Sequence, residues 1–175
     1  MKTLSEKQAL IKLRTLKNDF RNRIKQNYEH RAKDCGTCET KGACCVDAHF
    51  VNVHITKLEA VLIKEELAKF TPEKQKNIEK RISETVEKYN LSAEGDTFAQ
   101  TFACPLFEQN VGCLIHEVKP IPCVQHACYE RAEDLPPDEL QQTAEVKTER
   151  LNEQTYKQFA NWLPLPIQIN SSERS

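Results

Sequence analysis

The chain has 175 residues, a length that fits one compact domain. Its 25 Lys and Arg nearly balance its 26 Asp and Glu, and it contains eight cysteines but only four glycines. No run of about 18 apolar residues occurs, so we expect no membrane-spanning helix and no membrane partner. The N-terminus runs directly into a charged segment without the apolar region of a secretory signal. We therefore expect a cytoplasmic protein whose thiols serve metal or redox chemistry rather than disulfides.

The first segment, residues 1–34, is predicted to be a basic amphipathic helix packed on the domain. Apolar residues at steps of three and four form one stripe that reaches to about residue 32: Leu10, Leu13, Leu16, Phe20, Ile24 and Tyr28. This segment has ten Lys and Arg against four Asp and Glu, a balance of +6, whereas residues 35–175 have a balance of -7. The basic side chains that could contact a nucleic acid or an acidic protein partner are Lys12, Arg14, Lys17, Arg21, Arg23 and Lys25. A solvated helix face is the simpler alternative.

A helical insert is predicted over residues 56–90, between two blocks of cysteines. A short β-prone run over residues 49–55 precedes it, with His49 and His54 expected on the polar side of a strand. Thr56 and Glu59 have the spacing of a capping box, which marks the start of a first helix. A second helix is expected to start at Thr71-Pro72-Glu73, because proline is favoured at the first helical position.

The segment after the insert has a different pattern of apolar residues. Short apolar pieces around Gly112 indicate a hairpin or knuckle. Residues 119–123 contain two prolines and are predicted to be non-helical. A C-terminal helix is expected within residues 136–163, followed by a flexible tail over 164–175.

These elements predict a mainly α fold with short β-hairpin or knuckle pieces. The centre is a small, metal-stabilised cysteine-cluster domain over residues 35–128, with a long helix before it and a C-terminal helix after it.

The eight cysteines are the candidate metal ligands, and they fall into two blocks: Cys35, Cys38, Cys44 and Cys45, then Cys104, Cys113, Cys123 and Cys128. The spacing Cys35-x2-Cys38 is one by which a tight turn presents two thiolates to one ion. Disulfides, inert buried thiols and a thioredoxin-like dithiol are the alternatives. The last is disfavoured because Cys35 follows a long helix, whose C-terminal end is negative and does not lower a thiol pKa.

Four sequence blocks resemble a known family. They are Cys35-x2-Cys38-x5-Cys44-Cys45, then Val53-x-Ile55-Thr56-x2-Glu59-Ala60-x2-Ile63, then Cys104-Pro105-Leu106, then Cys113-x-Ile115-x3-Lys119-Pro120-x2-Cys123. Over residues 35–124 the chain is similar to the CxxCxxCC cysteine-cluster family, also called YkgJ-type, whose mostly bacterial members are described as zinc- or iron-chelating domain proteins. The resemblance implies metal chelation by the shared cysteines. It departs from the usual pattern in the five-residue gap before Cys44, in Lys119 for Arg and in His116 for an aromatic residue, and Cys128 and His126 lie beyond it.

Zinc is the metal that the residues favour. Four thiolates complete a tetrahedral zinc site, so eight cysteines suffice for one or two ions. The alternative is iron or an iron–sulfur cluster, although the usual C-x2-C-x2-C spacing of such clusters is absent. If Cys44 and Cys45 are extended, their thiolates point to opposite sides and could serve two ions. His116 or His126 could replace one cysteine as a ligand.

Enzymatic activity is left open by the sequence, which favours a structural role for the metal. The zinc-protease pattern H-E-x-x-H fails because Pro120 stands at its last position, and no glycine-rich nucleotide motif occurs. The resemblance leaves a methylase-like role possible, because some proteins with similar cysteine clusters are described as flagellin lysine N-methylases. Redox or sensing duty of an iron–sulfur protein is the other alternative.

Overall fold

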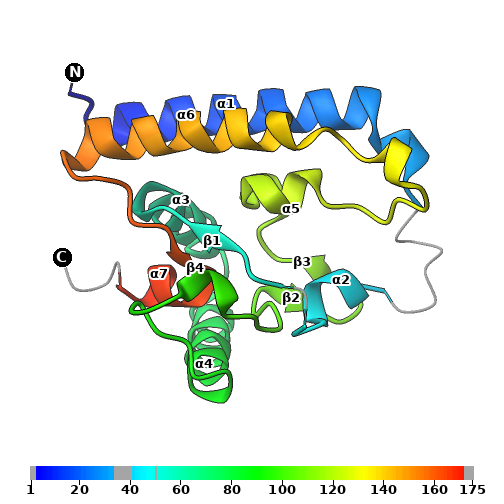
Figure 1. The fold of residues 1–175 in the computed structure, drawn as a ribbon. Helices are drawn as coiled ribbons and strands as arrows, with labels where there is room; N and C mark the ends of the chain where they lie inside the picture. Colours follow the sequence, from blue (N-terminus) through cyan, green and yellow to red (C-terminus); the bar gives the residue numbers. More distant parts are fainter. Residues whose placement is uncertain (1–2, 34–40, 50, 172–175) are drawn as a thin grey trace. The chain divides into compact units, whose positions relative to one another are not determined.

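The fold is mainly helical in a computed structural model that describes residues 3–33, 41–49 and 51–171 (Figure 1). Within these ranges, two antiparallel sheets of two strands each accompany the helices. The predicted fold class is thereby confirmed in its secondary structure. None of the helices in the described part of the chain is both long and apolar enough to cross a lipid bilayer.

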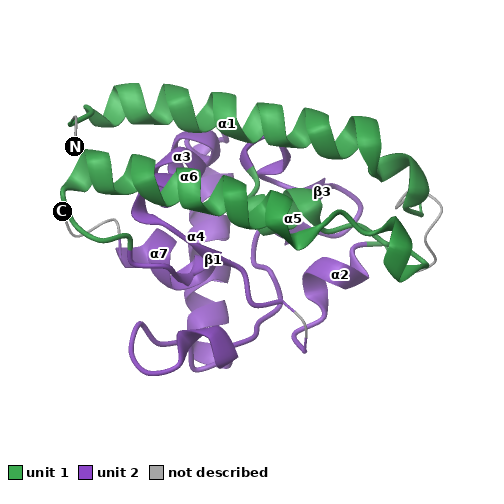
Figure 2. Cartoon of the chain, turned by 45° about the horizontal axis from the view of Figure 1, so that its top comes forward, with its two compact units in different colours: residues 1–41, 119–160 green, residues 42–118, 161–175 purple. Residues whose placement is uncertain are grey.

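The chain divides into two compact units, each made of two separate stretches of sequence (Figure 2). Unit 1 contains residues 1–41 and 119–160, and unit 2 contains residues 42–118 and 161–175. These boundaries do not coincide with the segments expected from the sequence, because the stretch 35–128 is shared between the two units.

Unit 1 is built on two long helices that lie side by side, α1 (Glu6–Asn27) and α6 (Asp138–Tyr156). The short α5 (Ile121–Gln125) packs on both, and the 3-10 turns η1 (Glu29–Arg31) and η5 (Ala132–Asp134) complete the unit. An apolar cluster joins the three helices: Phe20, Ile24, Ile121, Val124 and Ala144. Burial of these side chains is the main stabilising contribution to the packing of the three helices.

The predicted stripe on the first helix is largely confirmed, since Leu10, Leu13, Phe20 and Ile24 are buried. The helix itself ends earlier than expected, at Asn27, where the chain turns into η1. The C-terminal helix also ends earlier, because Lys157 adopts a left-handed backbone with φ 56°.

The expectation that residues 119–123 are non-helical is wrong from residue 121 onward, because Ile121–Gln125 form α5. Pro120 is the N-cap residue, and Pro122 lies in the first turn. The first N–H groups of a helix have no partner within that helix, so proline removes no hydrogen bond there. The rule against proline applies to helix interiors, and α5 is too short to have more than one turn beyond this position.

Unit 2 has a helical part and a part made of short elements. The helical part contains α3 (Lys57–Leu67), α4 (Pro72–Lys88) and α7 (Leu165–Ser171). Both predicted starts in the insert are confirmed: Thr56 and Glu59 form a capping box, and the Thr71 side chain caps α4 with Pro72 in its first turn. The 3-10 turns η3 (Thr97–Ala99) and η4 (His116–Val118) also belong to this unit.

The prediction of a flexible tail over residues 164–175 is wrong for residues 164–171. Leu163–Pro164 form β4, which pairs with β1 (His54–Ile55) in the register His54↔Pro164 and Ile55↔Leu163. Leu165 and Ile169 of α7 are buried. The apolar residues among the prolines therefore belong to the core of unit 2, while residues 172–175 lie outside the described part.

The remaining elements of unit 2 are α2 (Ala43–Val46), β2 (Phe107–Glu108) and β3 (Gly112–Cys113). β2 and β3 pair antiparallel, with Phe107 opposite Cys113 and Glu108 opposite Gly112. The predicted hairpin around Gly112 is confirmed, and positive φ at Asn110 and Gly112 permits its tight turn.

Candidate metal centre

Six of the eight candidate ligands lie in the described residues, and Cys35 and Cys38 lie outside them. Unit 2 holds Cys44 and Cys45 on α2, Cys104 just before β2, and Cys113 on β3. In unit 1, Cys123 lies on α5 and Cys128 in the segment that follows it. None of these six forms a disulfide, and all are half-buried. The part of the chain that the structure describes therefore agrees with reduced thiols.

The vicinal pair is helical, which overturns one premise of the sequence interpretation. Cys44 and Cys45 lie within the single turn of α2, where successive side chains are about 100° apart rather than opposite each other. Gly42 is the N-cap of this turn, with φ 78°. A Cβ at Gly42 would overlap the ring of Phe107, so only glycine lets the start of α2 lie directly against β2.

A backbone hydrogen bond joins the two cysteine blocks inside unit 2. The Cys104 N–H donates to the Cys45 carbonyl at 2.7 Å, and the Phe102 N–H donates to the Val51 carbonyl at 2.8 Å. The Leu114 N–H donates to the Leu106 carbonyl at 2.9 Å and extends the β2–β3 pairing. Cys45, Cys104 and Cys113 are thus carried by three segments that are bonded to one another.

The turn after Cys104 is closed by a backbone hydrogen bond, in which the Phe107 N–H donates to the Cys104 carbonyl at 3.3 Å. The backbone N–H groups of Leu106 and Phe107 act to lower the pKa of the Cys104 thiol. Ligand thiolates in metal sites are deprotonated, so the balance between the thiol and the thiolate at Cys104 bears on metal binding.

Without a bound cation, the surroundings of Cys104 favour the protonated thiol over the thiolate. Burial raises the pKa of the Cys104 thiol to about 11, with the nearby Cys113 acting in the same direction. The two backbone donors and the guanidinium of Arg81 lower it in part. Cys104 is therefore protonated at neutral pH, and a bound metal ion would supply the positive charge that favours its thiolate.

Arg81 is the residue that the sequence interpretation missed. It projects from α4, and its Nη2 donates to the Phe107 carbonyl, next to the turn that carries Cys104. On the same helix, Lys74 forms a 3.2 Å ion pair with Glu108 of β2. No sequence signal indicates these contacts, because Arg81 looks like any other charged residue on an amphipathic helix.

In unit 1, Cys128 lies beside residues 32 and 33. The Lys33 N–H donates to the Cys128 carbonyl at 2.9 Å, and Ala32 forms an isolated β-bridge with Tyr129. The Lys33 ammonium also lies 2.7 Å from a Glu130 carboxylate oxygen. The chain that leads to the first cysteine block thus runs beside Cys128.

No group of three or more Cys, His, Asp or Glu side chains in the described residues is gathered closely enough to hold one metal ion. The backbones that carry Cys45, Cys104 and Cys113 are joined, but their thiols do not form an assembled metal site.

The histidines have different surroundings. His116 and His126 are exposed. His54, expected on the polar side of a strand, is buried, and its ring nitrogens lie 2.6 Å from the Asn52 carbonyl and 3.0 Å from the Thr97 carbonyl. That expectation is wrong because β1 pairs with β4 and the His54 ring stacks on Phe98 at 4.2 Å.

The basic helix offers fewer cations than its sequence suggests. Lys17 is buried, and its Nζ donates to the Lys119 carbonyl at 3.2 Å. Arg14 and Arg21 are partly buried, whereas Lys12, Arg23 and Lys25 are exposed. Lys17 is therefore committed to the interior and is not positioned to contact phosphate.

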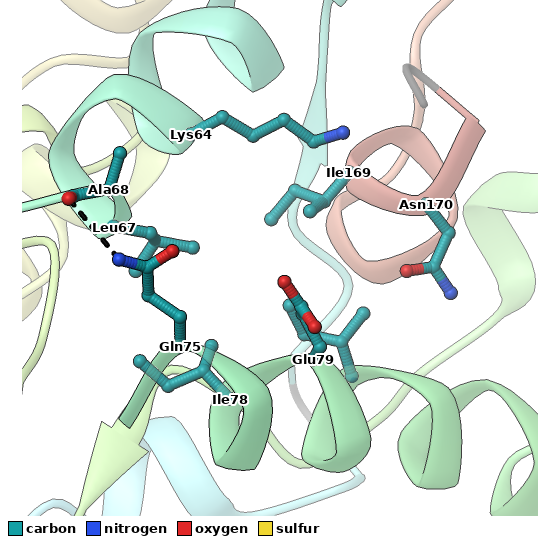
Figure 3. Close-up of a pocket in the computed structure, with 9 residues that line it drawn as sticks. Lys64, Leu67, Ala68, Gln75, Ile78, Glu79, Ile169 and Asn170 are labelled. Atoms are coloured by element: carbon teal, nitrogen blue, oxygen red, sulfur yellow. Dashed lines mark hydrogen bonds between the residues drawn. The ribbon is translucent and has the colours of Figure 1, made fainter. Parts of the chain in front are cut away.

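A pocket in the helical part of unit 2 lies among α3, α4 and α7 (Figure 3). Leu67, Ile78 and Ile169 form apolar walls, and Lys64 and Glu79 lie at its edge. Its volume is about 180 Å³, below the roughly 300 to 1,000 Å³ typical of small-molecule sites. The cysteine segments are for this reason the stronger candidate for function.

The chain matches no protein-family model, no curated protein and no solved structure. The similarity to the CxxCxxCC family accordingly rests on the four motif blocks quoted above.

Proposed function

We propose that this chain is a metal-binding cysteine-cluster protein in which the metal has a mainly structural role. The observation that carries the proposal is the backbone hydrogen bond between the two cysteine blocks, in which the Cys104 N–H donates to the Cys45 carbonyl at 2.7 Å. Cys113 lies on β3, which pairs with the strand that follows Cys104. The backbones that carry Cys45, Cys104 and Cys113 are therefore neighbours within unit 2.

Zinc is the metal we favour, as one or two ions. It binds four thiolates tetrahedrally, needs no redox change and adds its binding free energy to folding. The cysteine-bearing elements of unit 2 are a four-residue helix and two-residue strands, which have few hydrogen bonds of their own. Such short elements gain most from a metal that crosslinks them.

An iron–sulfur cluster with redox, sensing or methylase-like duty remains the second candidate for the same thiolates. Four thiolates also suit a [4Fe–4S] cluster, so the cysteine count alone does not choose between the metals. Reduced ligand thiols of either kind go with a reducing compartment, which is why the cytoplasm stays our predicted location.

Metal analysis with an absorption spectrum, on protein purified without oxygen, tests the proposal. We expect colourless protein with one or two zinc ions per chain. Brown protein with iron and sulfide would replace zinc by the second candidate. Protein that carries no metal and takes up neither zinc nor iron would overturn metal binding altogether.

A further inference from the structure

His54 is the buried histidine of this chain. All five histidines lie in the described residues, and the other four are exposed, whereas His54 is only 5% exposed. It lies on β1, with Nδ1 2.6 Å from the Asn52 carbonyl oxygen and Nε2 3.0 Å from the Thr97 carbonyl oxygen in η3. Each ring nitrogen therefore faces a hydrogen-bond acceptor.

Two acceptors on one imidazole ring favour its doubly protonated form. A neutral ring has one N–H donor, and its other nitrogen is an acceptor. Neutral His54 can therefore donate to only one of the two carbonyls, and the lone pair of its second nitrogen faces the oxygen of the other. A buried hydrogen bond that is left unmade is costly, because water does not replace it. The imidazolium donates to both carbonyls.

The surroundings of the ring also suit a positive charge. The Phe98 ring stacks on it with 4.2 Å between centroids and 18° between planes, and an aromatic face attracts a cation. Burial of a charged group is costly unless hydrogen bonds satisfy it, and here both N–H groups of the imidazolium have acceptors. The Asn52 side-chain amide also donates to the Phe98 carbonyl at 3.4 Å, which joins the same two segments again.

The elements around the ring contain no charged residue. This holds for β4 and α7, which pack on β1, and for η3. Asp96 precedes η3, and Lys57 and Glu59 follow β1 in α3, where the Glu59 carboxylate accepts the Thr56 N–H. Within the described ranges no carboxylate bonds to the His54 ring. Two carbonyls and an aromatic ring, rather than an ion pair, thus favour the second proton.

We propose that His54 is a pH-sensitive switch in unit 2, whose doubly protonated ring joins the Asn52 segment and η3 to β1. Loss of one proton to solvent removes one of the two hydrogen bonds and weakens this junction. Because the fold binds the proton more tightly than the unfolded chain does, the stabilisation is complete below the unfolded histidine pKa of about 6.5 and is lost as pH rises and the folded ring releases its proton. The proposal does not depend on metal binding, since none of the groups that contact the ring is a cysteine.

The protonation state can be measured directly in the full-length variant H30Q/H49Q/H116Q/H126Q, which keeps His54 as its only histidine. Nuclear magnetic resonance spectra that correlate the ring protons with the ring nitrogens show whether each nitrogen carries a proton. We expect both nitrogens to be protonated at pH 7, where an ordinary histidine is mostly neutral. A ring with one unprotonated nitrogen at pH 7 would overturn the proposal.

Urea denaturation at pH 6 and pH 9 measures the effect on stability. The folding equilibrium constant of the unmodified chain, divided by that of His54→Gln, should fall about three- to tenfold over this range, the contribution of one hydrogen bond. Both chains keep all eight cysteines, so cysteine titration cancels in the ratio. His49→Gln is the matched control, because His49 is exposed, and its ratio to the unmodified chain should not change with pH.

A ratio for His54→Gln that is the same at both pH values would contradict the switch. If His54→Gln does not fold, judged by its circular dichroism, the ring spectra of the single-histidine chain still decide. If the single-histidine chain does not fold, the unmodified chain should show one histidine with both nitrogens protonated at pH 7 and four that are mostly neutral. Five mostly neutral rings would refute the proposal.

Discussion

Units 1 and 2 support their cysteines in different ways. In unit 1, Cys123 lies on α5, whose neighbours Ile121 and Val124 belong to an apolar cluster with Phe20 of α1. In unit 2, the cysteines lie on a four-residue helix, a turn and a two-residue strand. The difference teaches where the proposed metal would contribute most: a helix packed on an apolar core is stable through burial, whereas such short elements are not.

Metal removal should produce the largest effect and should separate the two regions. Metal binding free energy is folding free energy for segments that lack a core of their own. After chelation, we expect hydrogen-exchange protection over residues 104–114 to fall by at least about tenfold, while protection in α1 and α6 changes little. An equal loss in both regions would contradict the comparison, as would no loss in residues 104–114.

Gly42→Ala should have the next largest effect after metal removal. The left-handed backbone costs a residue with a side chain about 1–2 kcal/mol, and overlap of the new Cβ with the Phe107 ring adds a further 1–3 kcal/mol or so. We expect a loss of about 3 kcal/mol in the free energy of unfolding, measured by urea denaturation.

Gly95→Ala is the matched control for that substitution. Gly95 has nearly the same φ, 75°, but nothing lies within 4 Å of the position of a Cβ. Only the backbone cost of about 1 kcal/mol should remain. If the two variants lose equal stability, the close contact between Gly42 and Phe107 does not contribute to the stability of unit 2.

Helix caps give a smaller comparison between the units. Thr56 and Glu59 in unit 2 form a buried capping box, whereas Ser5 and Gln8 in unit 1 form an exposed one. Thr56→Ala should cost about 1–2 kcal/mol and Ser5→Ala about 0.5 kcal/mol, because water replaces a lost bond only at the exposed cap. Thermal unfolding of the two variants, with Thr56→Ser as a conservative control, checks this order. A larger loss of stability in Ser5→Ala than in Thr56→Ala would contradict it.

The smallest expected effect depends on pH and belongs to unit 1. The Arg131 guanidinium donates to both Asp134 carboxylate oxygens, at 2.8 and 3.0 Å, and holds the pKa of Asp134 below its usual value. A lowered pKa in the folded state adds stability above the unfolded pKa of about 4 and loses it as pH falls. Asp134→Asn should therefore be less stable than the original chain at pH 7 and equal to it below about pH 3. A pH-independent difference would assign the effect to packing.

Local signals explain the parts of the fold that the sequence predicted. The starts of α3 and α4 depend on residues within four positions of each other, such as Thr56 and Glu59. The tail was mispredicted because β4 pairs with β1 across more than a hundred residues, and no local pattern encodes that pairing. The helix α5 was mispredicted because the position of Pro122 within the first turn decides its effect.

The candidate site could be predicted only as a set of residue types. Cysteine spacing identifies possible ligands, but the contact of Gly42 with Phe107 and the bond from Arg81 are tertiary and have no local signature. Lys17 was included among the candidate phosphate contacts because its charge suggested exposure, whereas its ammonium is bonded to the Lys119 carbonyl. A charged residue on the apolar face of a helix can be buried when a backbone carbonyl accepts a hydrogen bond from its charged group.

Zinc X-ray absorption on the metal-loaded chain, with all eight cysteines present, tests the central claim most directly. It counts the atoms bound to the metal and gives their distances without requiring crystals. We predict a shell of four ligands that is mainly sulfur, at about 2.3 Å. A shell made only of nitrogen and oxygen ligands would contradict metal binding by the cysteines.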